Sequence, residues 1–297
     1  MLVWILALSL LLPAACRAHG APRRFNLPPT PRGIVAHAVP YECLGRAYTG
    51  YVAMPAPTEA AADDDADDAN DADDETARFL PAVLVGHTWT GLGDMERYRT
   101  TQMASRGFVA FALDVYGTGV RPATEPEARG NMSKVESNVT DFYARLDCGL
   151  QQLLDTVEGD VRVNASQLFA NGYCFGGQMV LELARRRVQN LRAVSSFHGE
   201  LSNLRPNRTD AGITAVVQVH HASLDYQGDQ GLQAFEDEMR ALTVEHWSTS
   251  KYGSNVSHGW TDPTSMNYRP FYAEQSHSAM FRLYDQLLSE EAGGETE

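Results

Sequence analysis

The segment Gly172-Tyr173-Cys174-Phe175-Gly176-Gly177 has the composition of a site for nucleophilic chemistry. Its cysteine follows an apolar run, residues 168–170, that predicts a strand, and precedes an amphipathic run, residues 178–187, that predicts a helix. A turn this tight strains the backbone at the nucleophile and leaves no room for a Cβ two residues away. The N-terminus of the following helix favours a thiolate. The pattern predicts a nucleophile elbow at Cys174, with a buried structural cysteine as the alternative.

An acid and a histidine follow Cys174 in the chain order that such an elbow requires. Asp225 comes after the apolar residues 213–219, and His258 lies in a turn after the strand-like residues 244–252. His258 is predicted to act as the base and then as the proton donor, while Asp225 fixes its tautomer and stabilises its cation. Asp229, four residues further along the same loop, is the alternative acid.

With these residues in place, the chain resembles the dienelactone hydrolase family. The resemblance rests on the elbow, the His221…Asp225 loop and His258-Gly259-Trp260, and it extends upstream to residues 81–93 and 107–117. It spans about residues 48–288. It implies an α/β-hydrolase fold, a Cys174/Asp225/His258 triad and hydrolysis of ester, lactone or thioester bonds through an acyl-cysteine.

The resemblance also implies an oxyanion hole of backbone N–H groups, one from Phe175 and one from Thr88 or Trp89. Family members that open dienelactones carry a glutamate where this chain has Thr88, and arginines where it has Thr118 and Asp262; Arg121 lies close to the first of these arginine positions. Reversing a charge at Asp262 disfavours an anionic substrate. We therefore expect a neutral or cationic substrate, and a resting thiolate–imidazolium pair at the triad.

Several aromatic residues fall on loops that are expected to converge on the cysteine, which predicts an apolar or aromatic acyl pocket. Packing in the core is the alternative for each of them. The predicted pocket residues are Tyr116, Arg121 and Trp260. Four other histidines, His87, His198, His220 and His221, could suggest a metal site but show no metal-ligand spacing, so neither a metal nor a cofactor is predicted.

Strand-like and helix-like segments alternate along the 297 residues, which predicts an α/β fold with a mostly parallel sheet and helices on both faces. We expect strands near residues 48–54, 108–115 and 191–197, and helices over 94–106, 138–157 and 231–242. The predicted layout is a signal peptide over residues 1–18, an N-terminal arm over 19–45, a hydrolase domain over 46–290 and a flexible tail over 291–297.

The net charge of −14 is concentrated in one segment, because residues 63–75 contain nine acidic side chains and no basic one. Without that segment the net charge is −5. The segment lies in a low-complexity insertion, residues 56–77, that has no core-forming side chains and is expected to be disordered. The sequence has no clustered basic patch, so a nucleic-acid partner is not predicted. The predicted partner is a small-molecule substrate, an ester or a lactone.

The first residues predict export. An apolar run over residues 2–12 ends at Pro13 and is followed by the small-residue cleavage pattern Cys16-Arg17-Ala18. The run is short for a membrane span, and no other segment is long and apolar enough. Five Asn-x-Ser/Thr sequons support a secreted or lumenal glycoprotein. They begin at Asn131, Asn138, Asn164, Asn207 and Asn255.

Three cysteines remain after removal of the signal peptide. A disulfide between Cys43 and Cys148 is the one pairing that leaves Cys174 free, and three reduced thiols are the alternative. Two further functions stay open. One is an inactive secreted binding protein on the same fold, and the other is a redox-active thiol protein.

Overall fold

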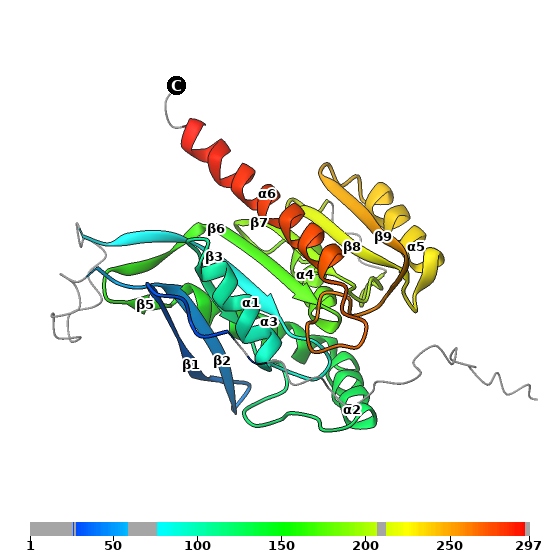
Figure 1. Cartoon of the computed structure of the whole chain (residues 1–297), viewed down its shortest axis with the longest axis horizontal. Helices are drawn as coiled ribbons and strands as arrows, with labels where there is room; N and C mark the ends of the chain where they lie inside the picture. Colours follow the sequence, from blue (N-terminus) through cyan, green and yellow to red (C-terminus); the bar gives the residue numbers. More distant parts are fainter. Residues whose placement is uncertain (1–25, 27, 59–75, 207–211, 295–297) are drawn as a thin grey trace, which may run out of the picture.

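A single nine-stranded sheet forms the centre of the protein (Figure 1). The computed structural model describes residues 26, 28–58, 76–206 and 212–294. Eight strands follow the order β1-β2-β4-β3-β6-β7-β8-β9, and β5 pairs with β6. Neighbours from β4 to β9 are parallel, whereas β1, β2 and β5 pair antiparallel. The strands are β1 (Ile34–Cys43), β2 (Arg46–Pro55), β3 (Arg78–Gly86), β4 (Val109–Ala112), β5 (Val157–Glu158), β6 (Val161–Tyr173), β7 (Leu191–Phe197), β8 (Val216–Leu224) and β9 (Trp247–Ser257).

Helices cover both faces of the sheet, as the alternating segments predict (Figure 1). Alternate residues of β3 divide between two cores: Leu84 packs with α3, α4 and α5, whereas Val85 packs with α1 and α6. This arrangement confirms the predicted mostly parallel α/β fold. The helices are α1 (Asp94–Ala104), α2 (Glu125–Glu136), α3 (Val139–Leu154), α4 (Phe175–Arg185), α5 (Gly228–Ala241) and α6 (Pro270–Gly294).

The predicted N-terminal arm needs correction. Residues 34–43 of the proposed arm, 19–45, form β1, which pairs with β2 along its whole length. Cys43 at the end of β1 is joined to Cys148 of α3, with the two Cα atoms 5.9 Å apart, as predicted. The sheet therefore begins at Ile34. At the other end, α6 continues to Gly294 and includes part of the predicted tail.

Several sequence predictions lie outside the described residues. They are the signal peptide, most of the acidic insertion and the sequon at Asn207. Of the other sequons, Asn255 is exposed and Asn138 caps α3 by accepting the Asp141 N–H at 3.1 Å. Asn131 and Asn164 are half-buried. Within the described part of the chain, no helix combines the length and apolar character of a membrane span.

Candidate active site

Cys174 lies at the junction of β6 and α4, with φ 55° and ψ −116°. Positive φ is a strained backbone conformation for a residue with a Cβ, and such strain is concentrated at functional sites. The Cys174 N–H donates to Phe197 O at 3.0 Å, and the Gly177 N–H donates to Cys174 O at 2.9 Å. These bonds hold the half-buried thiol at the first turn of α4.

The glycines of the elbow are required by close backbone approach. A Cβ on Gly172 would lie 1.9 Å from Gly176 O, and one on Gly176 would lie 2.1 Å from Gly86 O. Contacts this short do not occur between real atoms, so α4 packs against β3 and β6 only when both positions lack a side chain. The packing explains the spacing of glycines around Cys174.

His258 and Asp225 meet at the carboxyl end of β8 and β9. The His258 Nδ1 atom lies 3.0 Å from Asp225 Oδ2, and the Asp225 carboxylate is buried. The Gln227 N–H also donates to Asp225 Oδ1, at 3.3 Å. His258 lines the same cavity as Cys174, and its interaction with Cys174 raises the pKa of His258. The structure therefore brings the three predicted triad residues together at one site.

Burial and charge act in opposite directions on this pair. Burial lowers the pKa of His258, but the charges and hydrogen bonds of Cys174 and Asp225 outweigh it and hold the pKa well above 6.5. Burial likewise raises the pKa of Asp225, and the hydrogen bond and charge of His258 reverse this and lower it. The site therefore favours an imidazolium beside a carboxylate.

Asp229, the alternative acid, does not reach the histidine. Its carboxylate is 78% exposed and pairs with Lys251 on β9. The hydrogen bond from Lys251 lowers the pKa of Asp229. Of the two candidate acids, only Asp225 is in a position to orient His258.

Two aromatic rings flank His258, and the sequence predicted neither. His198 lies edge-on with ring centroids 4.8 Å apart, and its Nε2 is 2.7 Å from Thr261 Oγ1. Tyr226 lies on another side at 5.0 Å, and its hydroxyl donates to Glu200 Oε2 at 2.8 Å. Burial, and then the charge of His258, lower the pKa of His198, which keeps it neutral. The sequence signal that could have identified His198 is its place at the end of a strand, directly before Gly199.

The loop after β3 is held by a buried glutamate. Glu96 of α1 accepts the Thr88 N–H at 3.0 Å and the Gly93 N–H at 2.8 Å. The Thr88 amide is therefore occupied, which corrects the prediction that it is an oxyanion donor. Trp89, the other residue of this loop that the sequence offered as an oxyanion donor, stays a prediction. Its carbonyl accepts a hydrogen bond from the Tyr116 hydroxyl at 2.9 Å. The spacing of Gly93 and Glu96, a capping box, is the signal that sequence reasoning missed.

Cys174 opens into a cavity of about 260 Å³. The predicted pocket residues do not line it. Trp260 is fully buried in a small core with Tyr252 and Val256, and Tyr116 packs on the ring of Phe175, itself buried in the core. Arg121 donates to Leu92 O at 2.6 Å and lies 3.6 Å from buried Asp114. These aromatic and cationic groups support the loops around the cavity.

Apart from His258, the charged side chains that line the cavity are acidic. They are Glu125, at the start of α2, and Asp262, while no Lys or Arg is among the described lining residues. Asp262 accepts the N–H and the hydroxyl of Thr264, both at 2.7 Å. Thr118, at the other position where the resembling family carries an arginine, hydrogen-bonds Thr49 instead, at 2.8 Å. Apart from His258, the described lining thus offers an anionic substrate no counter-charge.

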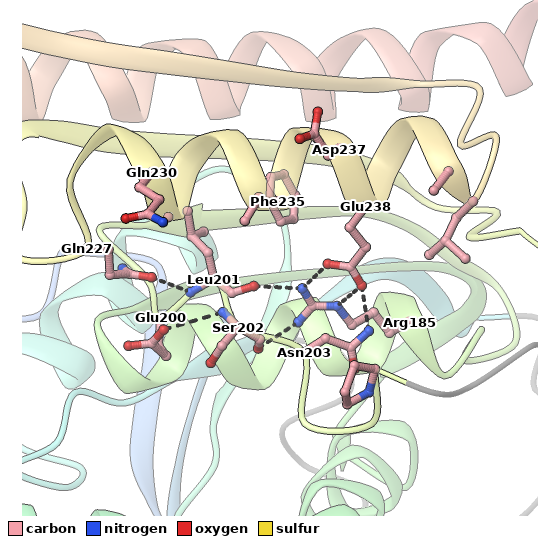
Figure 2. A pocket seen from close by; sticks show the side chains of 15 residues that line it. Arg185, Glu200, Leu201, Ser202, Asn203, Gln227, Gln230, Phe235, Asp237 and Glu238 are labelled. Atoms are coloured by element: carbon pink, nitrogen blue, oxygen red, sulfur yellow. Dashed lines mark hydrogen bonds and ion pairs between the residues drawn. The ribbon is translucent and has the colours of Figure 1, made fainter. Parts of the chain in front are cut away.

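A larger cavity, of about 820 Å³, lies between α5 and the segment after β7 (Figure 2). Arg185 occupies one end and is saturated: it pairs with Glu238 and Glu182 and donates to the carbonyls of Leu201 and Ser202. At the other end the Gln227 side chain accepts the Leu201 N–H at 2.8 Å and donates to Gly199 O at 2.7 Å. These bonds tie the His198 loop to the Asp225 loop.

Among the described residues no group of three or more His, Cys, Asp and Glu side chains is arranged to hold a metal ion.

Comparisons with known proteins agree with this geometry. A family model, the dienelactone hydrolase family, matches residues 69–288. An uncharacterised protein of Caenorhabditis elegans is 31% identical over 132 residues, which are 44% of this chain and 82% of that protein. Two solved structures are each 26% identical and cover 86% of this chain and 99% of their own. They are a protein named m3DLH, with a TM-score of 0.71, and a dienelactone hydrolase-like promiscuous phosphotriesterase from metagenomic libraries, with a TM-score of 0.69.

Proposed function

Because this chain belongs to the dienelactone hydrolase family, a family of ester and lactone hydrolases, we propose that it hydrolyses its substrate through a covalent acyl-cysteine at Cys174. The observation that carries the proposal is the chain of contacts from buried Asp225 through His258 to Cys174. A thiol on a strained elbow, an imidazolium beside it and a buried carboxylate behind it are the parts that nucleophilic acyl transfer needs.

The reaction has two steps. The Cys174 sulfur attacks the carbonyl carbon. The new oxyanion accepts hydrogen bonds from the backbone N–H groups of Phe175 and Trp89. His258 then donates its Nε2 proton to the leaving oxygen as the C–O bond breaks, which leaves a thioester. In the second step His258 removes a proton from water that attacks the thioester carbon. The acid product leaves, and the thiolate–imidazolium pair is restored.

The substrate class follows from the charges around the cavity. Glu125 and Asp262 lie in the lining, and Arg121 is engaged by Asp114 and the Leu92 carbonyl. Apart from His258, the charged groups that an anionic ester would meet in the described lining are these two carboxylates, so we propose a neutral or cationic ester, lactone or thioester. Faster turnover of an anionic dienelactone than of p-nitrophenyl acetate would contradict this proposal.

The direct test is hydrolysis of p-nitrophenyl acetate by the protein and by its Cys174→Ala variant. We expect the substitution to abolish hydrolysis, because no other nucleophile lies at the elbow. Cys43→Ala/Cys148→Ala is the matched control, since it removes the two disulfide-bonded cysteines, neither of which lines the cavity. Equal rates for the protein and Cys174→Ala would favour the alternative of an inactive binding protein on this fold.

We also propose that the protein enters the secretory pathway and carries N-linked glycans. The proposal is supported by the N-terminal apolar run, the five sequons and the Cys43–Cys148 disulfide. Asn255 is exposed three residues before His258, so a glycan there borders the active site. Peptide mapping of the secreted protein would contradict the proposal if all five asparagines were unmodified.

A further inference from the structure

The surface beside His258 carries exposed apolar side chains. Three large hydrophobic side chains are exposed there: Leu224 at 57%, Tyr226 at 46% and Met266 at 51%. We call these three residues the apolar rim. Exposed apolar side chains that lie singly need no explanation, but several around one histidine, with Met266 in the lining of the cavity, form a candidate binding surface.

Each member of the apolar rim is tied to His258 by a separate observation. Leu224 is paired with Ser257, the residue before the histidine. The Tyr226 ring lies 5.0 Å from the imidazole, and Met266 lines the Cys174 cavity together with His258. The loop that carries Met266 is fixed to the same place, because the side chain of Asn267 donates to His258 O at 2.8 Å.

The size of the cavity requires such a surface. A volume of about 260 Å³ is below the range of about 300–1,000 Å³ that is typical of sites enclosing a drug-sized ligand. A small ester therefore fits inside, whereas a longer substrate extends over the mouth. Where it passes His258, it meets the apolar rim, and no Lys or Arg is among the described residues that line the cavity.

The chemistry of the triad decides which end of the substrate lies there. His258 must be within hydrogen-bond reach of the leaving oxygen, because it protonates that oxygen as the C–O bond breaks. The alcohol part of the ester therefore leaves the cavity on the His258 side. We propose that the apolar rim binds the alkyl chain of the alcohol part, so that the preferred substrates are neutral esters of long-chain alcohols. This inference rests on the proposed function.

The test compares two series of neutral esters, each kept below the concentration at which it aggregates. In alkyl acetates from butyl to octyl, the four added methylenes lie on the alcohol side, and we expect kcat/KM to rise about tenfold or more, since a fully buried methylene contributes up to about fourfold. In methyl esters from butanoate to octanoate the rise should be smaller. An equal or steeper rise in the methyl ester series, or a flat alkyl acetate series, would overturn the inference.

Variants of the apolar rim test whether it is the source of the preference for long alkyl acetates. The double variant Leu224→Ser/Met266→Ser should lose most of the preference for octyl over butyl acetate. Phe79→Ser/Val157→Ser removes two exposed hydrophobic residues, one near the start of β3 and one on β5 beside the start of β6, at the opposite end of the parallel strands, and should keep this preference. Melting curves establish that each variant is folded, and the single variant Met266→Gln repeats the test if the double variant is not. An unchanged preference in the rim variants, or an equal loss in the control, contradicts the inference.

Binding of the product alcohol separates this inference from the proposed function. Titration calorimetry should show 1-octanol binding at least about tenfold more tightly than 1-butanol, and the difference should disappear in Leu224→Ser/Met266→Ser. If Cys174→Ala retains full esterase activity, the proposed mechanism fails while this binding still supports the apolar rim. If Cys174→Ala is inactive but the two alcohols bind equally, the rim fails alone.

Discussion

His258 is the residue on which the chemistry of the site converges. It contacts the nucleophile and the acid, and it is flanked by His198 and Tyr226, each of which is fixed by its own hydrogen bond. A ring held from two sides and through one nitrogen loses little freedom when substrate binds. Such preorganisation is what general acid–base catalysis requires.

The raised pKa of His258 predicts the pH dependence of activity. Acylation needs the protonated imidazole, so kcat/KM for p-nitrophenyl acetate should persist above pH 6.5 and fall only as the pH rises through the higher pKa in the folded protein. The same shift contributes stability that is fully present below pH 6.5 and is lost through that higher pKa. A decline of kcat/KM centred at or below pH 6.5 would contradict this assignment.

Asp225→Asn should lower kcat/KM by about two to four orders of magnitude, because the amide neither fixes the tautomer nor stabilises the cation. It should also move the alkaline fall to lower pH, since the hydrogen bond and charge of Asp225 help to hold the pKa of His258 up. Asp229→Asn is the matched control, because this exposed acid of the same loop pairs with Lys251. A similar loss in both variants would argue against Asp225 as the triad acid.

That Cys174, Asp225 and His258 come together was predictable at the level of single residues, because each follows a strand in the chain order that such an elbow requires. The residues that surround these three were less predictable. Trp260 was assigned to the pocket but lies in the core, since position in a loop does not determine the direction of a side chain. Glu96 and His198 were missed because their partners, Thr88 and Thr261, come together only through the fold.

At the scale of elements, the elbow is defined by the approach of α4 to β3. Gly176→Ala should destabilise the fold by about 3 kcal/mol or more, because its Cβ would overlap Gly86 O. Gly130→Ala is the control: that position in α2 has open space, and alanine should stabilise the helix by about 1 kcal/mol. Urea denaturation measures both. A Gly176→Ala variant as stable as the parent would refute the packing described for the elbow.

The parallel strands and α3 were predictable, since they are buried runs or carry a periodic apolar face. α2 was not, because it buries only Ala128 and Val135 and contains Gly130, which leaves no helical periodicity to read. β1 was also missed: it is an edge strand whose residues are mostly exposed or half-buried, so it lacks the apolar run of the inner strands.

At the scale of the whole molecule, the disulfide joins the antiparallel edge of the sheet to a helix that packs on its centre. Cys43 and Cys148 are 105 residues apart in sequence, and closing a loop of that length stabilises the folded state by about 4–5 kcal/mol in the chain-entropy model. Cys43→Ala/Cys148→Ala should therefore lose most of that amount in urea denaturation. A loss below about 1 kcal/mol would show that β1 is held mainly by its pairing with β2.

In the proposed mechanism, the helix faces, the order of the strands and the two loops that carry Asp225 and His258 together bring a covalent step to Cys174. The most direct test is to mix the protein with p-nitrophenyl acetate, quench it in acid within the first turnovers and map the acetylated peptide by mass spectrometry. We predict one acetyl group, on the peptide that contains Cys174. Hydrolysis that proceeds with no acetyl group on Cys174, or with acetylation at another residue, would contradict the acyl-cysteine mechanism.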